Sequence, residues 1–350
     1  VQDAAIQQIC DEEFANSANY PTETLIGLDY ALSIQKASGE TIHYGSNDVQ
    51  NYYEQQDASF NMMFYDEDTA RSYAEQFKSA MTAEGDTVLG ERISLVPQPQ
   101  ASVVIIDQST GYVKAIVGGR GSKEASLTLN RATATRRQPG STFKPLAVYA
   151  PAIEHNEKTL ASVYDNAPYQ YESGAELKNW DSDYGYSGLE TIHTALMKSI
   201  NVVAVKVLTE ITPQVGLDYL EQLGITTLYD NDTDADGNVL TDAYQPLALG
   251  GITDGVVNLE LTAAYAALAN GGSYIKPKFY SRIEDSNGNV ILDNTCTATQ
   301  VFQPTTAYLL TKAMEDVVQN PLGTAYQTIS LGDMPVAGKT GTTDSSKDIW

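Results

Sequence analysis

Long apolar runs are absent from this chain of 350 residues, and no stretch approaches the roughly 18 apolar residues of a membrane-spanning helix. The chain also does not open with the basic and apolar segments of a secretory signal. If the protein works outside the cytoplasm, we expect its targeting segment to lie upstream of Val1. A hydrophobic fraction of 42% still indicates a folded protein, and the length allows two domains.

Cysteine and histidine are scarce, with two of the first and three of the second. Cys10 and Cys296 form no metal-binding motif, and they could pair only if the fold brings them together. His43, His155 and His193 are scattered without the spacing of metal ligands. This scarcity argues against a histidine-based metal centre.

One acidic stretch, Asp232–Gly237, matches the first half of a calcium-binding loop. The twelfth position of that loop would be Ala243, where a bidentate glutamate should stand. No clear pair of helices brackets the stretch either. The sequence therefore favours a solvated acidic loop over a calcium site.

Basic residues are outnumbered, since 21 lysines and arginines stand against 45 acids and give a net charge of −24. This balance argues against nucleic acid, which binds basic patches, and against electrostatic binding to anionic lipid. The segment from 114 to 144 differs, because it holds seven bases and one acid, Glu124. Its charge could serve an anionic ligand or be a chance cluster of solvated side chains, and the sequence leaves both open.

Val96–Gln100 marks a domain boundary, because its two closely spaced prolines favour extended chain. Residues 1–98 are expected to form a small acidic α+β connector module that contains an amphipathic helix over Asp66–Met81. Beyond it, strands are expected in a hairpin over Ser102–Val117 and again at Val336–Thr342, with helices between them. That order indicates an α+β domain over residues 99–350.

The stretch Arg136–Pro145 predicts a tight Pro-Gly turn that leads into a helix from about Ser141 to Ile153. Ser141 and Lys144 are three residues apart, which places their side chains on one face of a helix. Pro145 has no N–H to give to the Ser141 carbonyl, so Ser141 belongs in the first helical turn or just before it. Unpaired N–H groups there suit an oxyanion, and a neutral lysine could take the hydroxyl proton. Taken alone, this stretch fits an ordinary helix start better than a nucleophile.

Two further motifs follow in order: Ser199-Ile200-Asn201, which interrupts a helical stretch, and Lys339-Thr340-Gly341 on the last expected strand. Each motif is weak by itself, and Ser-x-x-Lys also occurs at Ser33 and Ser273. Only the copy at Ser141 opens a predicted helix. The order and the local context of the three motifs therefore carry more information than any one of them.

Together the three motifs resemble the set found in serine penicillin-recognising enzymes. The surrounding sequence is similar to the transpeptidase domain of a class A (bifunctional) penicillin-binding protein. The similar stretches are Val113–Arg120, Arg137–Pro145 and Ala248–Gly251. The resemblance covers about residues 100–350, and residues 1–95 more loosely resemble the linker behind the glycosyltransferase domain of such proteins. It implies a β-lactamase-like α+β fold, with an antiparallel sheet and an all-α subdomain. It also implies truncation at both ends, with the C-terminal strands and helix of the domain missing.

The resemblance implies a D,D-transpeptidase that cross-links peptidoglycan stem peptides through a serine acyl-enzyme and that β-lactams inhibit covalently. Ser141 would be the nucleophile, Lys144 the general base, and Ser199 the relay to the leaving amine. Backbone N–H groups of Ser141 and Thr342 would form the oxyanion hole. The expected catalytic residues are Ser141, Lys144, Ser199 and Lys339, and the expected substrate-binding residues are Asn201, Thr340, Gly341 and Thr342.

The resemblance implies no metal and no organic cofactor. The expected partners are stem peptides and β-lactams, together with an upstream glycosyltransferase domain in the full protein, and nucleic acid is not expected. The expected location is the extracytoplasmic face of the bacterial plasma membrane, with an anchor in an N-terminal segment outside this chain.

Two alternatives stay open. One is a hydrolase of the same superfamily, a D,D-carboxypeptidase or β-lactamase, although no Glu-x-x-Leu-Asn motif lies between Ser199 and Lys339. The other is a non-catalytic β-lactam sensor, against which the complete set of catalytic side chains argues. Two departures from the family pattern bear on activity. Ile200 stands where aspartate is common, and the chain ends soon after Thr342, which would leave that strand on an unprotected edge.

Overall fold

The computed structural model describes residues 1–123, 128–155, 158–181, 185–234, 236–329 and 331–350. The chain divides into two compact units. The smaller comprises Asp11–Ala101 and Gly119–Ser126, and the larger comprises Val1–Cys10, Ser102–Gly118 and Leu127–Trp350. Within the described residues, no helix is both long and apolar enough to cross a membrane.

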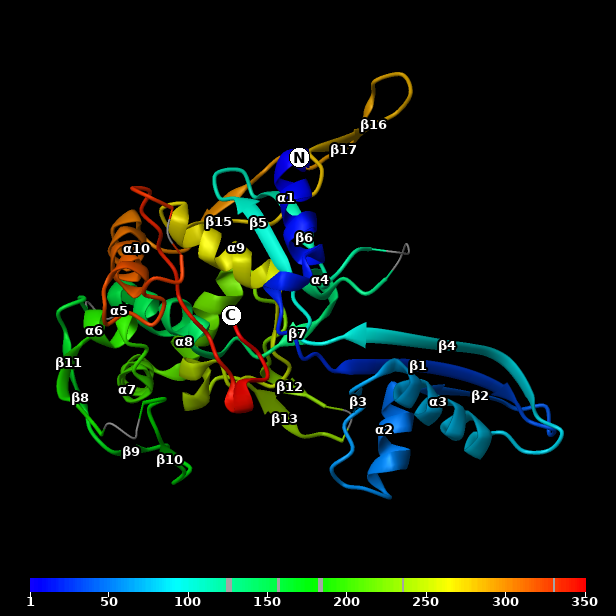
Figure 1. Ribbon diagram of the computed structural model, residues 1–350. Coiled ribbons are helices and arrows are strands. Elements are labelled where there is room, and N and C mark those ends of the chain that lie inside the picture. Colours follow the sequence, from blue (N-terminus) through cyan, green and yellow to red (C-terminus); the bar gives the residue numbers. More distant parts are fainter. Residues whose placement is uncertain (124–127, 156–157, 182–184, 235, 330) are drawn as a thin grey trace. The chain divides into compact units, whose positions relative to one another are not determined.

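The smaller unit is an antiparallel sheet with helices packed on it (Figure 1). Its long strand β1 pairs along much of its length with both β2 and β4, and at its start with β3. The elements are β1 (Ile26–Gln35), β2 (Thr41–Gly45), α2 (Ser46–Glu54), β3 (Met63–Phe64), α3 (Glu67–Met81) and β4 (Thr87–Pro97), preceded by the short η1 (Ser17–Asn19).

Helix α3 confirms the amphipathic helix expected over Asp66–Met81. Asp66 caps it, because its carboxylate accepts the Thr69 N–H at 2.7 Å, and the acidic first turn suits the positive end of the helix dipole. On its buried face, Phe77 meets Tyr30 of β1 edge to face, with ring centroids 5.9 Å apart. Aromatic packing of this kind holds the helix on the sheet.

The larger unit opens with α1 (Ala4–Ala15), whose last residues belong to the smaller unit, and with the hairpin of β5 (Val103–Asp107) and β6 (Tyr112–Val117). This hairpin is the one expected over Ser102–Val117. Its inner face packs on Leu259 of α9 (Asn258–Ala269), next to the buried Ala132.

Most of the apolar core of the larger unit surrounds α7 (Asn201–Ile211). Val202, Val203 and Ala204 are successive residues that point in different directions around this helix, yet all are fully buried. A helix that is apolar all round must be enclosed by others. Its neighbours are α5 (Ala150–His155), α6 (Ile192–Met197), α8 (Pro213–Gln222), η5 (Gln245–Leu249), α9 and α10 (Pro304–Gln319).

Short antiparallel strand pairs and turns complete the larger unit. They are α4 (Arg131–Ala134), β7 (Arg136–Arg137) with β14 (Val256–Val257), β8 (Val163–Asn166) with β11 (Gly188–Thr191), β9 (Tyr169–Gln170) with β10 (Glu176–Leu177), β12 (Asp230–Thr233) with β13 (Val239–Thr241), β15 (Ser273–Ile275) with β18 (Ala298–Gln300), β16 (Arg282–Glu284) with β17 (Val290–Asp293), and η6 (Asp344–Ser346).

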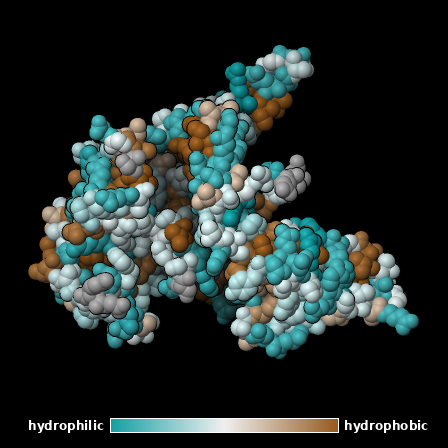
Figure 2. Space-filling model, viewed as in Figure 1, coloured by the Kyte–Doolittle hydropathy of each residue, from teal (hydrophilic) through white to brown (hydrophobic). Residues whose placement is uncertain are grey.

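The acidic stretch that resembled a calcium loop is the turn of the β12–β13 hairpin. The Asp234 carboxylate accepts from the main chain and the side-chain amide of Asn238, at 2.8 and 2.9 Å. Asp285 binds Asn289 in the same way in the β16–β17 hairpin, whose apolar surface is visible in Figure 2. Both acids stabilise a turn through hydrogen bonds to their own loop.

The strand expected at Val336–Thr342 does not form, and that prediction was wrong. A strand ladder needs an aligned neighbour along its whole length. The neighbour here is the short return at the end of the chain, where Gly341 exchanges two backbone hydrogen bonds with Trp350 and Thr342 pairs with Ile349. The N–H of Gly338 instead goes to the Met314 carbonyl on α10, at 3.2 Å.

Candidate active site

The turn that carries Ser141 is followed by an unusual helix. Gly140–Thr142 (η2) forms one 3-10 turn, and Lys144–Tyr149 (η3) is π-helical before α5 begins at Ala150. The expected helix therefore exists, but it begins at Lys144 and is wider at its start. The Pro145 carbonyl accepts the Ala150 N–H across this wide turn. Such π-helical turns are frequent at functional sites, and Ser141 lies just outside the helix, as the position of Pro145 requires.

Three backbone segments meet at Gly140, whose φ of +55° lies in the left-handed region. A Cβ at this position would lie 2.7 Å from the Thr342 carbonyl oxygen and 3.1 Å from the Thr342 nitrogen. At Gly250, a Cβ would lie 2.5 Å from the Gly140 nitrogen. Only glycine allows this approach. The main chain before Ser141 therefore lies against the main chain of Thr342.

Lys144 is fully buried, and its ammonium group reaches the second motif. Its Nζ donates to the Ser199 carbonyl at 2.6 Å, to Ser199 Oγ at 3.1 Å and to Asn201 Oδ1 at 2.7 Å. Burial, and to a lesser extent the charge of Lys339, hold the pKa of Lys144 well below its usual value, while Asp181 acts in the opposite direction. A lysine in this environment can be neutral and act as a base near pH 7.

The Ser199 hydroxyl joins the two lysines. Lys339 Nζ donates to Ser199 Oγ at 2.8 Å and to the Thr340 carbonyl at 2.9 Å. Burial lowers the pKa of Lys339 to about 7. Because Ser199 Oγ accepts from both amines, its own hydrogen is free to point to a third group.

Ser199 lies between α6 and α7, where the sequence predicted an interruption. Its φ is +57°, a conformation that residues other than glycine rarely adopt. This break directs the Ser199 carbonyl and hydroxyl to Lys144, while Asn201 begins the next helix.

The last motif reaches the site through both its backbone and its side chains. Thr340 Oγ1 is 2.7 Å from Thr324 Oγ1, which fixes that side chain. A Cβ at Gly341 would lie 2.7 Å from the Pro139 carbonyl oxygen, so this glycine packs on the turn before Ser141. The structure thus joins Lys144, Ser199, Asn201 and Lys339 by hydrogen bonds and packs the backbone of Gly341 and Thr342 on the turn that carries Ser141, although these residues come from three distant parts of the sequence.

Local charge at the site comes from the lysine pair rather than from the arginines of the segment 114–144. Arg137 pairs with Asp348 at 2.9 Å, and Arg136 pairs with Asp254. Lys114 lies 3.9 Å from Asp107. These bases are neutralised by acids, which weakens the interpretation that the segment serves an anionic ligand.

Sequence reasoning missed the groups that hold the turn in place. The Tyr265 hydroxyl donates to the Thr142 carbonyl at 2.6 Å, and the Trp350 indole donates to the Gln138 carbonyl at 2.8 Å. The Gln138 side chain bonds to both backbone groups of Ile252. These contacts join residues more than 100 positions apart, and no local pattern signals them.

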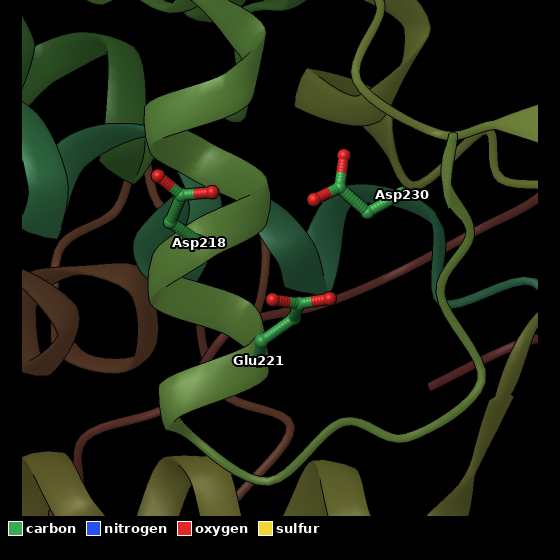
Figure 3. A group of neighbouring side chains, drawn as sticks. All are labelled: Asp218, Glu221 and Asp230. Atoms are coloured by element: carbon green, nitrogen blue, oxygen red, sulfur yellow. The ribbon is translucent and has the colours of Figure 1, made fainter. Parts of the chain in front are cut away.

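A group of three acids lies elsewhere on the larger unit (Figure 3). Asp218 and Glu221 are on α8 and Asp230 is at the start of β12, with carboxylate oxygens within 4.8 Å of one another. Partial burial and the neighbouring carboxylates raise the pKa of Glu221. All three residues are exposed, and exposed acids of this kind do not by themselves make a metal site.

Comparison with known proteins gives a consistent result. Residues 101–348 match the family described as penicillin binding protein transpeptidase domain. Penicillin-binding protein 1A of Clostridium tetani is 37% identical over 276 residues, which are 76% of this chain and 34% of that protein. Penicillin-binding protein 1A/1B of Bacillus subtilis is 32% identical over 73% of this chain and 26% of that protein. The chain spans about a third of the length of the curated relatives it matches.

Solved structures show the same likeness. The PonA1 protein of Mycobacterium tuberculosis in complex with penicillin V has a TM-score of 0.59 and 26% identity, over 72% of this chain and 64% of that one. Penicillin-binding protein 1A of Haemophilus influenzae has a TM-score of 0.60 and 21% identity, over 100% of this chain and 53% of that one. At that identity, the second likeness concerns the fold alone.

Proposed function

The chain belongs to the penicillin-binding protein transpeptidase family, and from this premise we propose that it is a serine D,D-transpeptidase that cross-links peptidoglycan stem peptides. One observation carries the proposal: the hydroxyl of Ser199 joins a buried lysine, Lys144, to a second lysine, Lys339, beside the turn of Ser141. A serine that merely has a lysine nearby needs no buried amine and no second lysine beside it. A lysine that acts as a base needs both to keep it neutral.

In the acylation step, Ser141 Oγ attacks the carbonyl between the two terminal D-alanines, and neutral Lys144 takes its proton. The oxyanion that forms faces the backbone N–H groups of Ser141 and Thr342. When the C–N bond breaks, Ser199 donates its hydrogen to the leaving amine and is reprotonated by Lys144. The products are an acyl-enzyme on Ser141 and free D-alanine.

In the second step, an amine from a neighbouring strand attacks the acyl-enzyme and loses a proton to Lys144. The C–O bond to Ser141 breaks, and the serine recovers that proton. A new peptide bond results, without a metal or a cofactor in the proposed steps. A β-lactam follows the first step only, because the opened ring stays attached and the leaving amine cannot depart.

We assign recognition of the terminal carboxylate to Lys339, with Thr340, Gly341 and Thr342 at its side. Asn201 would hold the amide of the substrate or orient Lys144, to which it is already bonded at 2.7 Å. We also propose that residues 1–98 are a connector behind a glycosyltransferase domain of the full protein. The full protein would act at the extracytoplasmic face of the plasma membrane.

The experiment that tests this function is labelling of the folded chain with a fluorescent penicillin, followed over hours. We expect a stoichiometric adduct that persists, because the deacylating glutamate motif is absent from the sequence between Ser199 and Lys339. Rapid turnover of a chromogenic β-lactam would instead favour the hydrolase. A folded chain that takes no label would favour the non-catalytic sensor.

Lys339→Ala is expected to slow penicillin acylation by about tenfold to a hundredfold, the loss that follows from removing a hydrogen bond to a charged group. The variant loses the positive charge for the carboxylate and the charge that lowers the pKa of Lys144. Stopped-flow or time-resolved labelling gives the rate. A variant that acylates at the parent rate would disprove this role.

Acylation is also expected to weaken as the pH rises above about 7, the pKa of Lys339 in the free protein. Above that value Lys339 loses its charge and attracts the carboxylate less, while burial holds the pKa of Lys144 well below its usual value. The second-order rate constant measured between about pH 6 and 9 reports the free protein. In Lys339→Arg, whose guanidinium keeps its charge, the alkaline fall should disappear, and an unchanged fall would contradict the assignment.

A further inference from the structure

We propose that residues 178–180 form a clamp that positions Ser199 and Asn201, and that Asn179 is its main positioning residue. The inference rests on the proposed function, because its consequence is the geometry around the base Lys144. The clamp residues follow directly on strand β10 (Figure 1) and lie 19 to 21 residues before Ser199 in the sequence.

The clamp is needed because Ser199 has a left-handed backbone conformation, with φ at +57°. A residue with a side chain keeps such a conformation only when its surroundings fix it from several sides. Here the residues before and after Ser199 are both held. The Trp180 indole donates to the Lys198 carbonyl at 3.0 Å. The side-chain amide of Asn201 donates to the Lys178 carbonyl at 2.9 Å.

Asn179 provides the third contact, since it caps helix α7. Its Oδ1 accepts the backbone N–H of Asn201 at 3.0 Å and of Val202 at 3.1 Å. Helices leave their first N–H groups unpaired, and the residue at the N-cap position, Ile200, has no polar side chain to satisfy them. Asn179 therefore supplies the missing cap from 22 residues away.

The orientation of the Asn179 amide is itself fixed. Asn179 is 3% exposed, and its Nδ2 donates to Asn166 Oδ1 at 2.8 Å. Asn166 in turn donates to the Ser187 hydroxyl at 2.8 Å. With its nitrogen occupied in this way, the oxygen of Asn179 faces the helix. The chain of side-chain amides leads from β8 to the first turn of α7.

The clamp determines where the Asn201 side chain points. Its Nδ2 is bound to the Lys178 carbonyl, and its backbone N–H is bound to Asn179. The Asn201 oxygen is then directed to Lys144 Nζ, at 2.7 Å. Loss of the cap would free the start of α7, and Lys144 would lose an aligned partner. Asn179 thus acts on the base through Asn201, without touching substrate.

A double-mutant cycle tests this coupling with the rate of fluorescent-penicillin acylation as the readout. Asn179→Ala should slow acylation by roughly tenfold to a hundredfold, as expected for a misplaced catalytic group. In an Asn201→Ala background the same change should cost less than about twofold, because the side-chain oxygen that Asn179 directs to Lys144 is gone. An equal loss in both backgrounds would overturn the proposal, and so would an Asn179→Ala variant that acylates at the parent rate.

Gln245→Ala provides the matched control. Gln245 also has a buried side-chain amide and is 5% exposed. This amide also bonds to α7, because it donates to Thr209 Oγ1 at 2.9 Å, and its oxygen accepts the Glu172 N–H at 2.8 Å. Its contacts do not include Asn201. We expect lower thermal stability but a parental acylation rate per folded molecule. A loss as large as that of Asn179→Ala would overturn the proposal, because the effect would then be general destabilisation.

If circular dichroism shows that Asn179→Ala is unfolded, Asn179→Asp tests the effect of the cap in a chain that still folds. Aspartate keeps the acceptor for the two N–H groups and is favourable at a helix N-terminus. We expect acylation clearly faster than that of Asn179→Ala, because the cap is kept while only the hydrogen bond to Asn166 is lost. A folded Asn179→Asp that is as slow as Asn201→Ala would overturn the clamp. A parent chain that takes no label contradicts the proposed function, whereas a labelled parent with an additive cycle contradicts the clamp alone.

Discussion

Ser141→Ala is expected to abolish covalent labelling by a fluorescent penicillin while the chain stays folded. The variant removes only the hydroxyl that would form the acyl bond. The turn that holds it is fixed by other groups, such as the Tyr265 hydroxyl on the Thr142 carbonyl at 2.6 Å. The measurement is in-gel fluorescence at saturating label, with thermal melting to verify the fold.

The chain offers two matched controls, since Ser33 and Ser273 also begin a Ser-x-x-Lys sequence. Ser33 lies on β1 and bonds to His43 at 2.8 Å, and Ser273 lies on β15 and bonds to Gln300 at 2.7 Å. Neither lies before a helix with a buried lysine. Ser33→Ala and Ser273→Ala should label like the parent. Label retained on Ser141→Ala would place the nucleophile elsewhere.

Gly140→Ala is expected to have the second largest effect, a loss of about 10²- to 10³-fold in acylation rate, which is typical when an oxyanion-hole donor is removed. The added Cβ would lie 2.7 Å from the Thr342 carbonyl oxygen, so the two backbones must separate. The N–H groups of Ser141 and Thr342 could then no longer face the same oxygen. Rate constants for penicillin acylation check this expectation.

Gly271→Ala is the control for backbone strain. Gly271 has a similar φ, +61° against +55° at Gly140, but a Cβ there would have no neighbour within 4 Å. Both variants carry the cost of a left-handed alanine, about 1–2 kcal/mol of stability. Only Gly140→Ala should lose acylation. Equal rates in the two variants would mean that the contact with Thr342 does not matter.

Much of the fold could be predicted from the sequence, because turn residues, apolar periodicity and the family motifs all indicate the same elements. The penicillin-recognising α+β fold is confirmed by the family match and by the solved structures. The hairpin over Ser102–Val117 and the helix that begins after Asp66 were also right, since turn residues and an apolar stripe define them locally.

The errors concern features that depend on distant neighbours. The residues at Lys144–Tyr149 are compatible with an ordinary helix, and their widening follows from packing of fully buried side chains. The extended stretch at Val336–Thr342 has strand-forming residues but too little chain aligned beside it. Asn179 could not be found from sequence either, because a cap from 22 residues away leaves no periodic signal.

The charge of the segment 114–144 illustrates the same limit. Its seven bases stand out in sequence, yet the acids that pair with Arg136 and Arg137 lie more than 100 residues later. Lys144, the base of that segment that lies in the candidate site, is distinguished by complete burial. Burial of a lysine is costly unless it is paired or neutral, which sequence composition does not reveal.

The hydrogen bonds of the lysine pair also have a consequence for folding. The contact from Lys144 to Ser199 spans 55 residues, and the contact from Lys339 to Ser199 spans 140. Loops of that length close late, because the entropy of closure must first be offset by other packing. A nascent chain that has not yet reached Lys339 already contains Ser141 but lacks the second cation. Under the proposed function, activation of Ser141 is therefore a late event in folding, and reaction with penicillin reports a natively assembled domain.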